Sequence, residues 1–162
     1  MLLEDIFDTD SSNYQVALLS SNLPTPFWYL SHPWFATYHN RESSRVEVLG
    51  YLGGLDRQFA SGLIKTHNNI VEGFQKAEGI PFLGRHTPSV NGMIQGGKNS
   101  LAHTIYKVVN NIDYLHERYP HINEYIPFPG PNSNTFAQWI INQFPKAKHK
   151  FQLPSTALGK DF

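Results

Sequence analysis

Residues 129–136 read PGPNSNTF, and the pattern that follows them decides how the C-terminal part of the chain folds. After this stretch, apolar residues recur at three- and four-residue spacing: Phe136, Trp139, Ile140 and Phe144. This spacing predicts an amphipathic helix over residues 133–144, ended by Pro145. The Pro-Gly-Pro turn therefore delivers Ser133 to the first turn of a buried helix.

The start of this helix suits either a nucleophile or a helix cap. Unpaired N–H groups and the positive end of the helix dipole favour developing negative charge there. Ser133 could therefore attack a carbonyl group while Asn132 and Asn134 stabilise the oxyanion. Asn, Ser and Thr are also the preferred N-cap residues, and a Pro-Gly-Pro turn before a cap needs no catalysis. The local sequence alone favours capping.

The N-terminal third is predicted to form strands. Aromatic and β-branched residues gather in three runs, over residues 14–19, 27–38 and 45–52. The polar stretch 39–44 predicts a hairpin between the second and third runs. We therefore expect strands within residues 14–52, after an N-terminal extension over residues 1–13. Neither face of the third run is purely polar, so both faces should be partly covered.

The remainder is predicted to be loops and helices, within a single α+β domain over residues 1–162. Most glycines lie in residues 53–97, which is typical of a loop-rich insert. Apolar residues at three- and four-residue spacing predict a long helix over residues 98–119. The other elements that we expect are a short helix, a short strand and an irregular tail, over residues 61–76, 124–128 and 146–162.

The composition excludes several classes of protein. Thirteen basic residues balance thirteen acidic ones, which argues against broad nucleic-acid binding but allows a local basic patch. The absence of cysteine excludes disulfides, thiolate nucleophiles and Cys-type metal sites. No run approaches the roughly 18 apolar residues of a membrane span. The acidic N-terminus lacks the basic residues of a signal peptide, so we expect a cytoplasmic protein, with non-classical secretion left open.

The histidines do not indicate a metal site. Eight are scattered along the chain, and no His-x-x-x-His pair is present. We therefore expect neither a catalytic metal nor a cofactor. The sequence does not indicate the oligomeric state or name a substrate, which could be a small molecule, a peptide or an acyl group.

Two segments resemble the signatures of a bacterial family of unknown function. Residues 130–136 read GPNSNTF, and residues 153–162 read LPSTALGKDF. Weaker matches lie at residues 32–35 and 45–50, and at Gly84, Arg85 and Pro88. Together they follow the family order from about Phe27 to the C-terminus.

That family is similar in turn to circularly permuted papain-like proteins, such as NlpC-type cell-wall peptidases and lecithin retinol acyltransferase-like proteins. In those chains an early-strand histidine comes first, a polar residue on the next strand follows, and an Asn-Cys-Asn-type motif opens a helix last. The resemblance implies a permuted papain-like fold, an antiparallel sheet packed against helices. It also implies that Ser133 is the nucleophile, His32 the general base and Glu47 the residue that orients His32.

Serine stands here in place of the cysteine of those papain-like proteins. A thiol paired with histidine can rest as a thiolate, whereas a hydroxyl must lose its proton as it attacks. Three interpretations are therefore open: a serine-type hydrolase or acyltransferase acting on an amide or ester, a catalytically inactive ligand- or protein-binding module, and a purely structural role.

Further residues could complete a site around His32. Arg45 shares a strand face with Glu47 and could pair with it or replace it. Trp34 could line a substrate groove. Residues 91–97, together with Arg85 and His86, could cover that groove as a lid.

Overall fold

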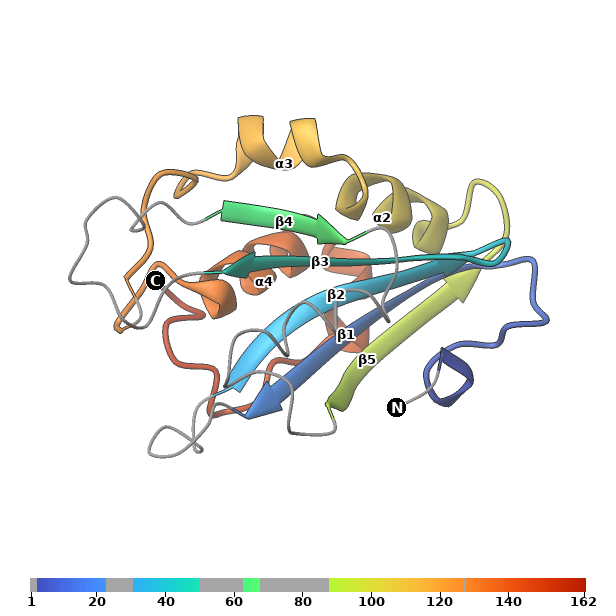
Figure 1. Cartoon of the computed structure of the whole chain (residues 1–162), viewed down its shortest axis with the longest axis horizontal. Helices are drawn as coiled ribbons and strands as arrows, with labels where there is room; N and C mark the ends of the chain where they lie inside the picture. The colour runs from blue at the N-terminus through green and yellow to red at the C-terminus, as the bar shows by residue number, and fades with distance from the viewer. Residues whose placement is uncertain (1–2, 23–30, 50–62, 68–87, 127) are drawn as a thin grey trace.

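The computed structural model describes residues 3–22, 31–49, 63–67, 88–126 and 128–162. Their strands form one antiparallel sheet in the order β4-β3-β2-β1-β5 (Figure 1). The strands are β1 (Tyr14–Asn22), β2 (Ser31–His39), β3 (Glu42–Leu49), β4 (Leu63–His67) and β5 (Ser89–Gly96). An α+β fold with an antiparallel sheet packed against helices is confirmed, whereas the papain-like fold is not.

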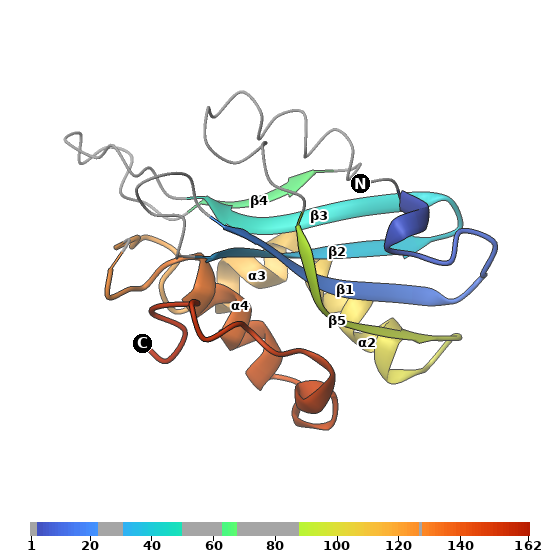
Figure 2. The same ribbon diagram turned by 90° about the horizontal axis from the view of Figure 1, so that it is seen from below.

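The α-helices of the described residues lie on one face of the sheet, as Figure 2 shows. They are α2 (Leu101–Val109), α3 (Ile112–Arg118) and α4 (Ser133–Asn142). Two short 3-10 helices accompany them, η1 (Leu3–Asp5) before β1 and η3 (Pro145–Lys150) after α4. None of the helices in the described ranges is long and apolar enough to cross a membrane.

The alternation of side chains along each strand builds a core on both sides of the sheet. Phe35 of β2 and Val46 of β3 are register partners and pack toward the helices, in one cluster with Phe136 and Ile140 of α4. Trp34 and its register partner Leu19 point the other way, into a second cluster with residues that include Phe7. Both faces are therefore buried, as the mixed pattern of the third run predicts.

The predicted β2–β3 hairpin is confirmed, with a tighter turn than the polar stretch suggested. His39 pairs with Glu42, so Asn40 and Arg41 alone make the turn. Both have positive φ angles, +49° and +68°, which a two-residue hairpin turn requires.

The predicted long helix over residues 98–119 is wrong, because two asparagines divide it into α2 and α3. The side chain of Asn110 donates to the Tyr106 carbonyl at 2.9 Å and to Thr37 Oγ1 of β2 at 3.0 Å. The side chain of Asn111 then accepts from the Tyr114 N–H at 3.0 Å and so begins α3. Asparagine ends and begins helices in this way because its side chain competes for backbone hydrogen bonds.

The loop-rich insert contains two strands that the sequence analysis missed. Residues 63–67, placed in a predicted helix, form β4 beside β3. Residues 91–96 of the expected lid belong to β5, an edge strand paired with β1, so the lid prediction is wrong for them. Arg85 and His86 lie outside the described residues.

A glycine explains part of the irregularity of β5. Gly92 has φ +152° at a register shift, and a Cβ there would lie 1.9 Å from the Lys150 carbonyl oxygen. Glycine inside a strand often marks such a bulge or close approach. The short strand predicted over residues 124–128 is also wrong, since the described residues 124–126 and 128 form no strand. In the tail, η3 is regular, whereas residues 151–162 run as predicted without helix or strand.

Candidate functional site

Four predicted site residues form a buried cluster, here the sheet-face cluster, of His32, Trp34, Arg45 and Glu47. His32 Nε2 lies 2.8 Å from Glu47 Oε2, and Arg45 Nη2 donates to the same oxygen at 2.8 Å. The Arg45 guanidinium also stacks on Trp34, 4.1 Å from the ring centroid. Arg45 and Glu47 are 1% and 0% exposed, so their ion pair is shielded from water.

Strand geometry explains why these four residues meet. Arg45 is the register partner of Ala36, which puts it on the Trp34 side of the sheet, and Glu47 lies two residues further along β3. His32 precedes Trp34 by two residues on β2, and the two rings lie 6.1 Å apart. The cluster therefore sits on the sheet face opposite the α-helices.

The other three predicted site residues open α4, where Asn132, rather than Ser133, is the N-cap. Asn132 Oδ1 accepts from the N–H groups of Asn134 and Thr135, at 2.9 and 3.3 Å. Thr135 Oγ1 in turn accepts from the Asn132 N–H at 3.0 Å, which completes a capping box. Ser133 thus occupies the first position inside the helix.

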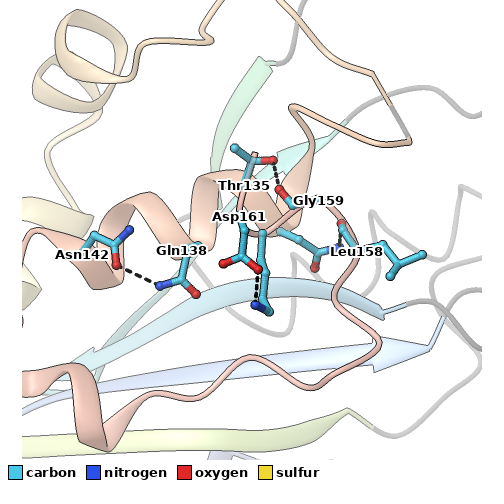
Figure 3. Close-up of polar contacts among 8 residues, drawn as sticks. Thr135, Gln138, Asn142, Leu158, Gly159 and Asp161 are labelled. Atoms are coloured by element: carbon cyan, nitrogen blue, oxygen red, sulfur yellow. Dashed lines mark hydrogen bonds and ion pairs between the residues drawn. The ribbon is translucent and has the colours of Figure 1, made fainter.

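The same side chains bind the C-terminal tail, as Figure 3 shows for Thr135 and Gly159. Asn132 Nδ2 and Asn134 Nδ2 both donate to the Leu158 carbonyl, at 3.1 and 2.9 Å. Thr135 Oγ1 donates to the Gly159 carbonyl at 2.6 Å. Hydrogen bonds therefore join the two signature segments to each other. We name this contact, between residues 132–135 and residues 158–159, the tail junction.

Gly159 permits this close approach. Its φ is +83°, and a Cβ would lie 2.4 Å from the Pro129 carbonyl oxygen and 2.6 Å from Asn132 Nδ2. Only glycine adopts this backbone without strain and leaves the space that the asparagine needs.

Ser133 is buried and hydrogen-bonded to a residue that the sequence analysis did not identify. Its side chain and its backbone both make hydrogen bonds with the Tyr125 hydroxyl. Burial raises the pKa of Tyr125 above the usual value of 10, and the hydrogen bonds from Ser133 only partly offset this rise. Tyr125 is therefore a neutral phenol at physiological pH and a poor general base.

The structure does not bring Ser133 and His32 together. Ser133 begins α4, whose Phe136 packs on the Phe35 face of the sheet. His32 lies on the opposite, Trp34 face, with Glu47. The predicted pair of His32 and Glu47 is thus present on the Trp34 face, whereas the predicted trio of Asn132, Ser133 and Asn134 opens a helix that packs on the Phe35 face.

A groove that the sequence analysis did not identify lies between α4, η3 and the tail. It has a volume of about 570 Å³, and residues along it include Gln138, Lys148, His149, Phe151, Gln152 and Lys160. One sequence signal could have indicated it, because residues 125–160 contain four lysines and no aspartate or glutamate.

The described parts of the chain hold no group of three histidine, aspartate or glutamate side chains arranged to bind a metal ion.

The chain belongs to the DUF3750 family of proteins of unknown function, because the model of that family matches residues 14–162. This match confirms the membership that the GPNSNTF and LPSTALGKDF segments indicated. Neither the curated proteins nor the solved structures give a match. No link to papain-like proteins is shown.

Proposed function

We propose that this member of the DUF3750 family is a binding module in which Ser133 has no catalytic role. The alternative is the serine-type hydrolase or acyltransferase that the papain-like resemblance implies. One observation carries the proposal: His32 lies with Trp34 on one face of the sheet, whereas the helix that Ser133 begins packs through Phe136 on the other face. A general base must reach the proton that it removes, within about 2.6–3.2 Å or through one water.

The surroundings of Ser133 support the same conclusion. A serine hydroxyl is a weak nucleophile until a neighbouring base removes its proton. The side chain that hydrogen-bonds to Ser133 is Tyr125, whose pKa is raised by burial, so it remains protonated at neutral pH. An activated serine is therefore not expected here.

The amides that could have stabilised an oxyanion are also occupied. Asn132 and Asn134 direct their side-chain NH₂ groups to the Leu158 carbonyl. The Asn134 and Thr135 N–H groups are bound by the Asn132 side chain. The helix start thus holds the tail in place, which suits a scaffold for binding better than a site for acyl transfer.

A serine-reactive fluorophosphonate tests the proposal directly. The folded protein is incubated with the probe, and its mass is then measured intact, with an active serine hydrolase as the positive control. We expect no covalent adduct on the folded chain. An adduct that maps to Ser133 and disappears in the His32→Gln variant would overturn the proposal and restore the hydrolase.

A further inference from the structure

We propose that the groove between α4, η3 and the C-terminal tail binds a small organic polyanion, one that carries two or more carboxylate or phosphate groups. This inference rests on the proposed binding function and names the ligand class. It combines two independent features of the groove, its shape and its charge.

The residues that line the groove include Lys148 and Lys160 and no acidic residue, and they belong to a basic segment of the chain. Residues 125–160 contain Lys146, Lys148, Lys150 and Lys160 but none of the thirteen acidic residues of the chain. The whole chain is neutral, so this segment is a basic region on a protein whose other parts are acidic in balance. Such a region raises the local concentration of anions and favours their binding.

Two segments bring basic side chains to the groove. Lys148 and His149 come from the last turn of η3, and Lys160 comes from the tail. Cations that converge from separate segments suit a ligand with more than one anionic group, because each group can meet its own partner. Lys148 and His149 make no ion pair with any described residue.

The groove is open, and its size suits a small molecule. A volume of about 570 Å³ lies within the range of roughly 300–1,000 Å³ that is typical of ligand sites. The buried residues Ile141 and Phe151 line it, together with Gln138 and Gln152. Because Phe151 is only 4% exposed, it offers no face for stacking a base, which argues against single-stranded nucleic acid.

The tail junction positions Lys160. Thr135, Asn132 and Asn134 hold the carbonyls of Leu158 and Gly159, immediately before Lys160. One turn along α4 from Asn134, Gln138 donates to Asn142 Oδ1 at 3.0 Å, as Figure 3 shows, and it lines the groove together with Lys160. The family signature therefore helps to build one wall of the groove.

Asp161 is the present partner of Lys160 and a competitor of the proposed ligand. The Lys160 and Asp161 side chains are 32% and 77% exposed, so their ion pair is well solvated. Solvated pairs contribute little stability. A polyanion can therefore displace Asp161 from Lys160 at little cost.

Calorimetric titration at low ionic strength tests the inference, with citrate and pyrophosphate as the probes. We expect saturable binding of at least one probe, weakened about tenfold or more by the double substitution Lys148→Gln and Lys160→Gln. The Asp161→Asn variant should bind several-fold more tightly, because it frees Lys160. The ratio of the two affinities distinguishes a carboxylate ligand from a phosphate ligand.

A matched double variant distinguishes specific binding in the groove from non-specific electrostatic attraction of the anion to the protein. Lys98→Gln with Lys107→Gln removes the same charge at two exposed positions outside the groove, and it should leave binding within about twofold. Equal weakening by both double variants, no binding of either probe, or displacement of the bound probe by a short oligothymidylate would overturn the inference. A Ser133 adduct with fluorophosphonate would overturn the proposed function and leave the polyanion site untouched, because Ser133 is not among the residues that line the groove.

Discussion

The sheet-face cluster and the tail junction are both buried and polar, but they are built in different ways. The sheet-face cluster joins charged side chains of two adjacent strands, His32 with Glu47 and Arg45. The tail junction joins neutral amides and a hydroxyl to backbone carbonyls that are 24 to 26 residues away in sequence. Either group, taken alone, resembles half of a catalytic site, although each is held together by its own hydrogen bonds.

The largest expected effect comes from the sheet-face cluster. Glu47→Gln removes the buried carboxylate that lies 2.8 Å from both His32 Nε2 and Arg45 Nη2, so the free energy of unfolding should fall by about 3–5 kcal/mol. Urea denaturation measures this loss. Glu42→Gln, at the exposed start of the same strand, is the matched control and should change stability by less than about 0.5 kcal/mol. Equal effects of the two substitutions would contradict the ion-paired cluster.

The next effect comes from the tail junction. Gly159→Ala forces a Cβ toward the Pro129 carbonyl at a positive φ, so the free energy of unfolding should fall by about 2 kcal/mol or more. Gly97→Ala is the control, since a Cβ there meets only Asn13 Oδ1 at 3.9 Å. Thermal unfolding of both variants gives the comparison. A Gly159→Ala variant as stable as the control would show that the tail is not held as described.

Substitutions of Asn132 and Ser133, at the start of α4, test which of the two residues is the N-cap. Asn132→Ala removes the N-cap and a bond to the tail, so it should cost about 1–2 kcal/mol of stability. Ser133→Ala removes one hydroxyl hydrogen bond and should cost about 0.5–1 kcal/mol. The reverse order, measured by urea denaturation, would return the capping role to Ser133.

The smallest effect is a pH dependence on the helix side of the sheet. Burial raises the pKa of Tyr125, so the folded state keeps this proton at a pH where the unfolded state releases it. Stability is therefore full below pH 10 and falls as the pH rises toward the folded pKa, by at most about 1.4 kcal/mol per pH unit for one group. Tyr125→Phe should reduce this alkaline loss, measured as urea midpoints at pH 9 and 11. An unchanged loss of stability in the Tyr125→Phe variant would show that another group causes the alkaline loss.

The sequence analysis predicted correctly those elements that depend on residues close together in the sequence. The apolar spacing after Ser133 predicted α4, and the polar stretch after Tyr38 predicted the β2–β3 hairpin. The break between α2 and α3 depends on Asn110 reaching Thr37 of β2, a contact that helical spacing cannot indicate. The strand β5 was hidden by its glycines, one of which makes room for a carbonyl of η3.

The members of each group of site residues were predicted correctly, but the placement of the two groups relative to the sheet was not. Side chains alternate along a strand, so the parity that places Phe35 toward α4 places His32 away from it. Both faces of β2 are apolar and aromatic, and the sequence therefore did not indicate which face the helices cover. The resemblance concerned the order of the motifs along the chain. That order does not determine toward which face of the sheet the His32 side chain points.

The central claim is that the sheet separates Ser133 from His32, and the lack of cysteine in the chain allows a direct test. Ser133→Cys introduces a single thiol, whose rate of alkylation by iodoacetamide can be followed against pH, with and without His32→Gln. The separation predicts slow alkylation at neutral pH that rises only as the pH approaches the ordinary thiol pKa of about 8.5, and an unchanged pH profile when His32 is replaced. Rapid alkylation at neutral pH that is lost with His32→Gln would contradict it and show a papain-like pair.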